Sequence, residues 1–358
     1  MPNTAPAATA GRRLPAPALA DFAARIFSAL GTRQEAARVV ADALVDADLA
    51  GHGSHGVMRI PRYAGFVRDG AVDPTAQARV VAVDGAAARI DAGWGWGQPA
   101  GMLAVATARE LVEQHGLAAV TIANCNHIGR LGAYGERLAE QGLVGIALCN
   151  AEPVVAPAGS RDRLLGTNPL ALAAPRSGGA PVVLDIATAA VAEGKLSLAR
   201  DAGAAIPTGL VVDAEGRPSD DPRAFYDGGA LLPFGGHKGS GISIFIEILG
   251  GILSGSGAAA GSRYDHGNGT LVLALDPGRL VGTIPFADAV AELTGVVEAS
   301  RPVDAAQPVM MPGTPEQRAR RERERDGVPV SAVVWAELER VAGELGVDPA
   351  LDGLEAAA

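Results

Sequence analysis

Apolar residues recur every three or four positions in two stretches near the start of the chain, residues 18–31 and 33–51. This spacing places one apolar stripe along an α-helix, so we predict an amphipathic helix in each stretch. The same pattern returns in residues 331–346, after a charged helix predicted over 314–327. Residues 1–14 lack the pattern, and we expect a disordered tail there.

The middle of the chain alternates between short apolar runs and amphipathic stretches. A hairpin of two strands is predicted over residues 76–93, followed by a helix over 97–116 that ends at Gly116. The next segments are strand 117–125, helix 129–142, strands 143–150, 170–175 and 181–188, helices 191–203 and 240–257, and strand 270–277. Apolar strands that alternate with helices indicate an α/β fold whose sheet is covered on both faces.

Length and composition narrow the class of protein. The chain has 358 residues, so two domains, or one domain with an added helical layer, are expected. Its formal net charge of -10 argues against a nucleic-acid partner, because a phosphate backbone requires a basic surface. Cys125 and Cys149 lie in apolar runs, which favours a reducing compartment without disulfides. No secretory signal and no apolar run of about 18 residues is found, so we expect a cytoplasmic protein without a membrane span.

Residues 51–56 match the dinucleotide fingerprint G-x-G-x-x-G letter for letter, but their context is wrong. The fingerprint requires a strand before it and a helix after it, so that the pyrophosphate meets a helix N-terminus. Here a predicted helix comes before, and Arg-Ile-Pro-Arg follows. A near match at residues 255–260 also follows a helix. We therefore do not expect an ordinary Rossmann turn.

The same segment carries a compact set of reactive side chains: Ser54, His55, Arg59 and Arg62. A histidine can exchange a proton near neutral pH, a serine hydroxyl can fix its tautomer, and an arginine can hold a carboxylate through two parallel bonds. The alternative is a polar loop with exposed histidines. The six histidines of the chain are scattered, and no spacing typical of a metal site is present.

A second candidate lies in residues 124–132, Asn-Cys-Asn-His-Ile-Gly-Arg-Leu-Gly, where a predicted strand ends and a helix begins. Such a junction presents backbone N–H groups and the positive end of a helix dipole, which suit a phosphate or a carboxylate. Gly129 and Gly132 would let a ligand approach the backbone closely. The alternative is a helix capped by asparagine, with His127 facing solvent.

Three loops complete the set of candidates. Residues 166–169 and 185–188 lie at strand ends, where ligands gather in open α/β sheets, although turn chemistry alone also explains the Asn-Pro pair. Residues 233–241 form a glycine-rich loop whose Lys238 could neutralise a phosphate. This loop does not satisfy the P-loop pattern.

Six blocks, taken in order, resemble those of a known family. The blocks are GHGSHGVMRIPRY, NCNHIGRLGAYGE, GTNPLALAAP, LDIATAAVAEGK, IPTGLVVDAEGRPSDDP and GGALLPFGGHKGSGISIFIEILGGILSG. Together they resemble the type-2 malate/L-lactate dehydrogenase family over about residues 15–345. The resemblance implies a three-layer α/β/α domain with a mixed sheet, which binds NAD or NADP without a Rossmann fingerprint. It also implies a helical part made of the N- and C-terminal regions, and a homodimer.

The resemblance assigns roles to segments and residues. It implies a helical substrate and dimer part over 15–75 with 310–358, and a nicotinamide-binding domain over 76–309. Ser54 and His55 resemble the catalytic serine and proton donor, Arg59 the substrate-carboxylate contact, and Thr167 a further substrate contact. Some members have their acid/base histidine at the position of His127. The residues that resemble cofactor contacts are His127, Ile128, Gly129, Arg130, Leu131, Asp185, Ile186, Ala187, His237, Lys238, Pro312 and Gly313.

The implied activity is hydride transfer between NAD(P) and a small 2-oxo or 2-hydroxy carboxylic acid. One alternative is reduction of a cyclic imino acid, but the family's imino acid reductases carry an aspartate where this chain has Lys195. The motif His-Ile-Gly-Arg at 127–130 resembles a branch that acts on bulkier 2-oxo acids. A cofactor-binding homologue without chemistry is a second alternative. A hydrolase using Ser54 and His55 is disfavoured, because no G-x-S-x-G elbow exists.

Overall fold

The computed structural model describes residues 11–351, so residues 1–10 of the predicted disordered tail lie outside the described residues. The chain divides into two compact units. The first, which we call the helical unit, contains residues 11–77, Trp94–Pro99 and 314–351. The second, the α/β unit, contains Ala78–Gly93 and Ala100–Gly313.

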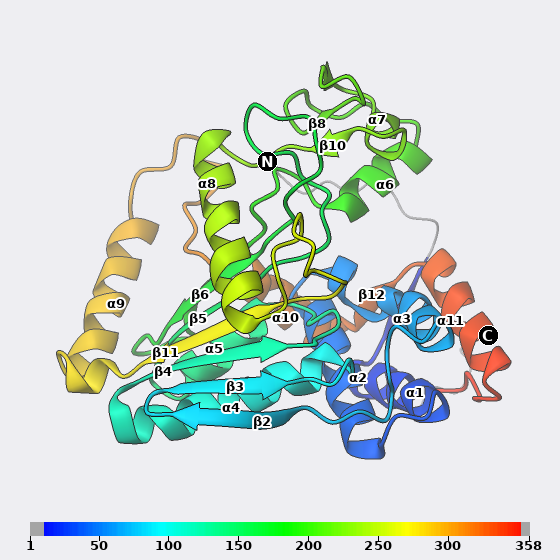
Figure 1. Ribbon diagram of the computed structural model, residues 1–358. Helices are drawn as coiled ribbons and strands as arrows, with labels where there is room; N and C mark the ends of the chain where they lie inside the picture. The colour runs from blue at the N-terminus through cyan, green and yellow to red at the C-terminus, as the bar shows by residue number, and fades with distance from the viewer. Residues whose placement is uncertain (1–10, 352–358) are drawn as a thin grey trace. The chain divides into compact units, whose positions relative to one another are not determined.

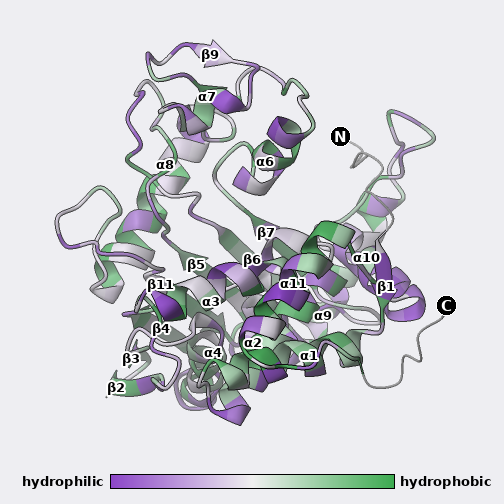
Figure 2. Cartoon of the chain, turned by 90° about the vertical axis from the view of Figure 1, so that its right-hand side faces the viewer, coloured by the Kyte–Doolittle hydropathy of each residue, from purple (hydrophilic) through white to green (hydrophobic). Residues whose placement is uncertain are grey.

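The helical unit is built from five helices and one strand pair. Its helices are α1 (Ala16–Ala29), α2 (Gln34–Leu49), α3 (Ile60–Arg68), α10 (Thr314–Asp326) and α11 (Ala332–Glu344). The predicted helices at both ends of the chain are therefore confirmed. Aromatic side chains fill the core, where Phe27 and Trp96 meet edge to face at 5.1 Å between ring centroids. Helix α10 is polar along its length and is mostly purple in Figure 2.

The beginning of the described chain differs from the expected disorder. Strand β1 (Arg12–Leu14) pairs antiparallel with β12 (Val328–Val330). Leu14 is buried in the core of the helical unit, and this burial offsets the entropy lost when the segment becomes ordered. The three-residue run was too short to show a pattern in the sequence.

The α/β unit contains a mixed sheet of seven strands in the order β2-β3-β4-β11-β5-β6-β7. The strands are β2 (Arg79–Asp84), β3 (Ala87–Asp91), β4 (Leu117–Ala123), β5 (Val144–Cys149), β6 (Leu170–Ala174), β7 (Val182–Ile186) and β11 (Thr270–Leu275). Only β3 and β4 pair parallel, and the other neighbours pair antiparallel. The predicted hairpin, strands and mixed sheet are thus confirmed. Strand β11 lies between β4 and β5, which come much earlier in the chain.

Helices cover both faces of this sheet, as the alternation of strands and helices predicted (Figure 1). Helices α4 (Gly97–His115) and α5 (Gly132–Glu140) pack with one face, which includes Ala147 and Cys149 of β5. Leu148, between these two residues, points to the other face and packs with Ile246 of α8 (His237–Ile246). Alternate burial along β5 therefore produces the three layers of the α/β unit.

Two elements differ from the predicted pattern. The single helix expected over 240–257 is α8 followed by a π-helical segment, η3 (Glu247–Ile252). Helix α9 (Thr283–Glu298) was not predicted, because its apolar residues do not form one buried stripe and only Thr294 is buried. The remaining elements are α6 (Glu193–Asp201), α7 (Arg223–Tyr226), the small sheet of β8 (Val211–Val212), β9 (Pro218–Ser219) and β10 (Ala230–Leu231), and the short turns η1 (Gly53–His55), η2 (Val57–Arg59) and η4 (Pro277–Arg279).

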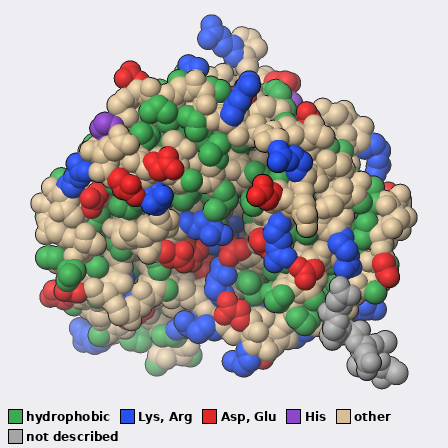
Figure 3. Space-filling model, turned by 90° about the horizontal axis from the view of Figure 1, so that it is seen from below, with side chains coloured by type: hydrophobic (Ala, Val, Ile, Leu, Met, Phe, Trp, Pro, Cys, Tyr) green, Lys and Arg blue, Asp and Glu red, His purple; other side chains and the backbone are tan. Residues whose placement is uncertain are grey.

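The surface of the described residues carries both charge signs. Figure 3 shows acidic and basic side chains interspersed over one face, with apolar side chains between them. In residues 11–351, no helix is long and apolar enough to cross a membrane. Within the same residues, no group of three or more His, Cys, Asp or Glu side chains is arranged to hold a metal ion.

Candidate active site

In the helical unit, a short helical turn presents Ser54, His55 and Arg59 together. The turn consists of η1 and η2 and leads into α3. Pro61 lies in the first turn of α3, a position where proline is tolerated. Ser54 Oγ lies 3.0 Å from His55 Nδ1, and Arg59 Nε donates to the Ser54 carbonyl at 2.5 Å. All three residues are partly exposed. The structure therefore brings together the serine, histidine and arginine that the sequence singled out.

Asp48, a residue of α2 that the sequence did not single out, holds this turn in place. Its Oδ2 accepts the Val57 N–H at 2.8 Å, and its side chain fills the space where a Cβ on Gly56 would lie. Arg323 of α10 donates to the Asp48 carbonyl. Burial raises the pKa of the Asp48 carboxyl to about 7, although the Val57 hydrogen bond and the Arg323 charge both oppose this shift.

In the α/β unit, the predicted cofactor and substrate segments converge on the end of β7. Asp185 Oδ2 accepts the N–H of Gly132 at 2.8 Å, which joins the turn at 127–131 to this strand. The carbonyl of Thr167 accepts from Thr188 N at 2.9 Å and from Thr188 Oγ1 at 3.0 Å. Two segments that are far apart in the sequence, the turn at 127–131 and the Thr167 loop, thus meet the end of β7. In open α/β sheets, ligands bind at strand ends of this kind.

One further segment reaches the end of β7, and another contacts the start of this strand. Phe234 N donates to Thr188 O at 2.9 Å, which places the glycine-rich loop and the start of α8 beside Thr188. Val183 N donates to Pro312 O at 3.3 Å, and Gly313, with φ of 88°, packs on Val183. Pro312 and Gly313 therefore lie along the outer edge of β7.

The start of α8 has the chemistry that a phosphate requires. Gly235 and Gly236 have φ of 58° and 60°, which favours glycine, and His237 and Lys238 are exposed in the first helical turn. Beyond Gly236 and its neighbours in the chain, no described atom lies within 4 Å of the position where a Cβ on Gly236 would stand. Open glycines, a lysine and a helix N-terminus together form a donor set that fits the phosphates of a dinucleotide.

The turn at 127–131 is held from several sides. Asn268 Oδ1 accepts the Ile128 N–H at 3.0 Å, and Tyr134 donates its hydroxyl to the Ile128 carbonyl at 2.5 Å. Arg130 is buried and pairs with Glu136 at 2.6 Å. Because this ion pair engages the guanidinium, the backbone of the turn is better placed than the Arg130 side chain to contact a ligand.

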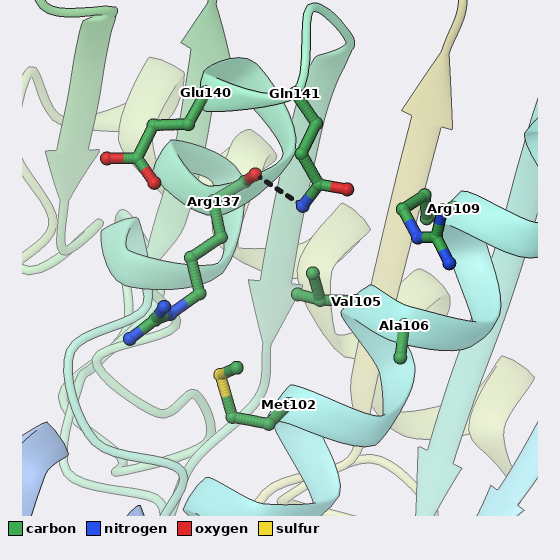
Figure 4. A pocket seen from close by; sticks show the side chains of 7 residues that line it. All are labelled: Met102, Val105, Ala106, Arg109, Arg137, Glu140 and Gln141. Atoms are coloured by element: carbon green, nitrogen blue, oxygen red, sulfur yellow. Dashed lines mark hydrogen bonds between the residues drawn. The ribbon is translucent and has the colours of Figure 1, made fainter.

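A separate cavity of about 250 Å³ opens between α4 and α5 (Figure 4). Its lining residues are Met102, Val105, Ala106, Arg109, Arg137, Glu140 and Gln141. In the close view, Gln141 donates to the Arg137 carbonyl at 2.9 Å. None of the predicted site residues lines this cavity, so it does not belong to the candidate site.

The comparisons with known proteins agree with the motifs. The family model described as malate/L-lactate dehydrogenase matches residues 14–339, which is most of the chain. The chain belongs to the malate/L-lactate dehydrogenase family. The predicted class, an oxidoreductase of small carboxylic acids that uses a nicotinamide cofactor, is therefore confirmed.

Similar members of the malate/L-lactate dehydrogenase family differ in their named activities. Hydroxycarboxylate dehydrogenase B of Escherichia coli (strain K12) is 35% identical over 346 residues, covering 94% of this chain and 95% of that enzyme. The Delta(1)-pyrroline-2-carboxylate/Delta(1)-piperideine-2-carboxylate reductase of Pseudomonas putida is 37% identical over 340 residues, covering 92% and 96%. The structure of sulfolactate dehydrogenase from Methanocaldococcus jannaschii aligns with a TM-score of 0.87 at 32% identity, covering 94% of this chain and 98% of that one.

Proposed function

We propose that this enzyme transfers hydride between NAD or NADP and a small 2-oxo or 2-hydroxy carboxylic acid, with His55 as the proton donor. The main support is the contact between Ser54 Oγ and His55 Nδ1, beside an arginine suited to a carboxylate. The proposed acid/base and carboxylate groups belong to the helical unit. The proposed cofactor contacts belong to the α/β unit and do not form a Rossmann fingerprint.

In this proposal, each side chain has one task. Ser54 fixes the orientation of the His55 ring through Nδ1, so proton exchange with the substrate oxygen would use Nε2. Arg59 holds the carboxylate and thereby orients the carbonyl carbon. Lys238 and the open glycines before α8 would bind the phosphates of the cofactor, and the segments 127–131, 185–187 and 312–313 would bind its remaining parts. The bound nicotinamide supplies or accepts the hydride.

Among substrates, we place open-chain 2-oxo acids first. The supporting observation is Lys195, an exposed cation in the first turn of α6, at the position where imino acid reductases of the family carry an aspartate. A cyclic imino acid is the second candidate, because a relative at 37% identity is named as a reductase of such compounds. Thr167, whose loop meets Thr188, would contact either substrate.

A substrate panel tests the proposed activity. Oxidation of NADH and of NADPH is followed at 340 nm with oxaloacetate, pyruvate, phenylpyruvate, sulfopyruvate, diketogulonate and piperideine-2-carboxylate. We expect turnover of at least one oxo acid, and this would identify the cofactor at the same time. Turnover of the imine alone would contradict the argument from Lys195. Absence of turnover with every compound would leave the cofactor-binding homologue without chemistry as the better description.

Replacement of Arg59 by alanine should raise the KM for the oxo acid by about 10- to 100-fold and change kcat less. The reason is that the carboxylate is held equally in the ground state and in the transition state. Arg59→Lys should recover only part of the loss, because an ammonium cannot form two parallel bonds. The neighbouring Arg62, which stacks on Phe66, provides the matched control Arg62→Ala. An unchanged KM in Arg59→Ala would remove Arg59 from the substrate site.

We also propose a cytoplasmic homodimer. Support for a second copy comes from apolar side chains that remain exposed on helices of the α/β unit. They are Phe245, Ile252 and Leu253 on α8 and the segments after it, and Ile284, Leu293 and Val296 on α9. Large apolar side chains exposed on neighbouring turns of a helix favour an interface with a second copy. Cys125 and Cys149 are buried free thiols, as a reducing compartment such as the cytoplasm allows.

Sedimentation equilibrium tests the proposed homodimer. It should give twice the mass of the chain, and a monomer would contradict the dimer.

A further inference from the structure

A single carboxylate lies buried where α8 ends and η3 begins, in an otherwise apolar segment. Glu247 is 5% exposed, and its two oxygens accept four N–H groups. Oε1 accepts from Asn168 Nδ2 at 2.8 Å and from Gly166 N at 3.2 Å. Oε2 accepts from Ala259 N at 2.8 Å and from Asn150 Nδ2 at 3.0 Å. Both oxygens are therefore satisfied inside the protein, as a buried carboxylate requires.

The first pair of bonds holds the loop that contains Thr167. Gly166 and Asn168 flank Thr167, and both donate to the same oxygen of Glu247. Asn168 has φ of 36°, a conformation that asparagine tolerates, and its Oδ1 accepts the Ala151 N–H at 3.1 Å. Asn168 Nδ2 also donates to Ser243 Oγ at 2.9 Å, so Glu247 and Ser243 together hold the residues on either side of Thr167.

The second pair of bonds, those to Oε2, includes Asn150, and Asn150 connects Glu247 with the turn at 127–131. Asn150 receives a hydrogen bond on its carbonyl from Asn268 Nδ2 at 2.7 Å, and Asn268 in turn accepts the Ile128 N–H at 3.0 Å. Asn150 is fully buried and Asn268 is 7% exposed, so water does not readily replace these bonds. Hydrogen bonds therefore connect Glu247 to Asn150, Asn150 to Asn268 and Asn268 to Ile128 without interruption.

We propose that Glu247 is a positioning residue that fixes two binding loops of the α/β unit at once, the Thr167 loop and the 127–131 turn. This inference rests on the proposed function, in which the first loop contacts substrate and the second contacts the cofactor. The π-helical turn supports it, because an irregular turn at the end of α8 carries the side chain that meets both branches. Glu247 touches neither reactant and acts only through its neighbours.

The test compares Glu247→Gln with the wild-type enzyme and with Glu140→Gln, which removes a carboxylate from the exposed side of α5. The glutamine amide nitrogen cannot accept a hydrogen bond, so the donors facing that side of the residue lose their partner. Hydrogen exchange followed by mass spectrometry should be at least about tenfold faster in residues 126–131 and 165–169 of Glu247→Gln. Glu140→Gln should leave both segments unchanged.

Binding and kinetics provide the second readout. Titration with NADH and with NADPH, followed by cofactor fluorescence, should show a Kd about tenfold weaker in Glu247→Gln. The KM of the oxo acid found in the panel should rise about tenfold, with kcat within about threefold of the wild type. Asn268→Ala breaks only the branch to Ile128, so it should weaken cofactor binding without raising the KM of the oxo acid.

The outcomes separate this inference from the proposed function. Faster exchange confined to residues 257–261, with Kd and KM within about twofold of wild type, would overturn the positioning role. If wild-type enzyme turns over no substrate, the proposed function fails, yet the exchange measurement still decides whether Glu247 fixes the two loops. If Glu247→Gln does not fold, Asn268→Ala decides: unchanged exchange in residues 126–131 would contradict the proposal.

Discussion

Replacement of His55 by alanine should lower kcat by a factor of about 10² to 10⁴, the usual contribution of a general acid, while the affinity for the nicotinamide cofactor stays unchanged. The loss follows because the variant lacks the imidazole, held by Ser54, that would donate a proton to the developing alkoxide. Cofactor affinity is preserved because His55 is not one of the proposed cofactor contacts. Steady-state kinetics and fluorescence titration measure the two quantities.

His52 provides a matched control for this change. It precedes His55 by three residues, and its Nε2 lies 3.3 Å from Glu316 of α10. His52→Ala removes the same kind of ring without a role in the proposed reaction, so turnover should be retained. If His55→Ala keeps full turnover, the proton donor lies elsewhere, and His127→Ala becomes the decisive variant.

Replacement of Asp48 by asparagine should remove a large part of the pH dependence of stability. Burial raises the pKa of this carboxyl from 3.8 to about 7. Between about pH 4 and pH 7 the folded protein holds a proton that the unfolded chain has released, so the free energy of unfolding falls as the pH rises. A pKa difference of about 3 corresponds to about 4 kcal/mol, and this loss is complete above about pH 7.

Urea unfolding at several pH values from 4.5 to 8.5 measures this effect. The wild-type free energy of unfolding should fall relative to that of Asp48→Asn by up to about 4 kcal/mol across the range. Asp42→Asn, which removes a carboxylate from the exposed side of the same helix, controls for the change in net charge. A constant difference between wild type and Asp48→Asn at all pH values would show that Asp48 keeps its charge in the folded protein.

The local pattern of apolar and polar residues was sufficient to predict the elements that have a regular buried face. Helix α4 and strands β4 to β7 were predicted to within a few residues, because each has a regular apolar face or a continuous apolar run. Helix α9 was missed because its apolar residues are exposed on more than one side. The insertion of β11 between β4 and β5 could not be predicted, since pairing between distant strands leaves no local signal.

The site could be predicted only in part, and for a related reason. Ser54, His55 and Arg59 lie within six residues of one another, so their proximity follows from the sequence alone. Glu247 could have been noticed as the only charge in the helix predicted over 240–257, but three of its four partners lie 79 to 97 residues away on other segments. Asp48 occupies a buried position of α2, and only the three-dimensional contact with Val57 shows its importance.

The central place of β11 has a consequence for biosynthesis. A nascent chain that ends before Thr270 carries β4 and β5 as two separate edges, each with unpaired backbone N–H and C=O groups. The strand pair of the helical unit also forms late in synthesis, because β1 at residues 12–14 pairs with β12 at residues 328–330. Pairing between strands that are far apart in the sequence makes folding slow. It also leaves apolar strands exposed during translation. The last quarter of the chain is therefore the part whose synthesis completes both units.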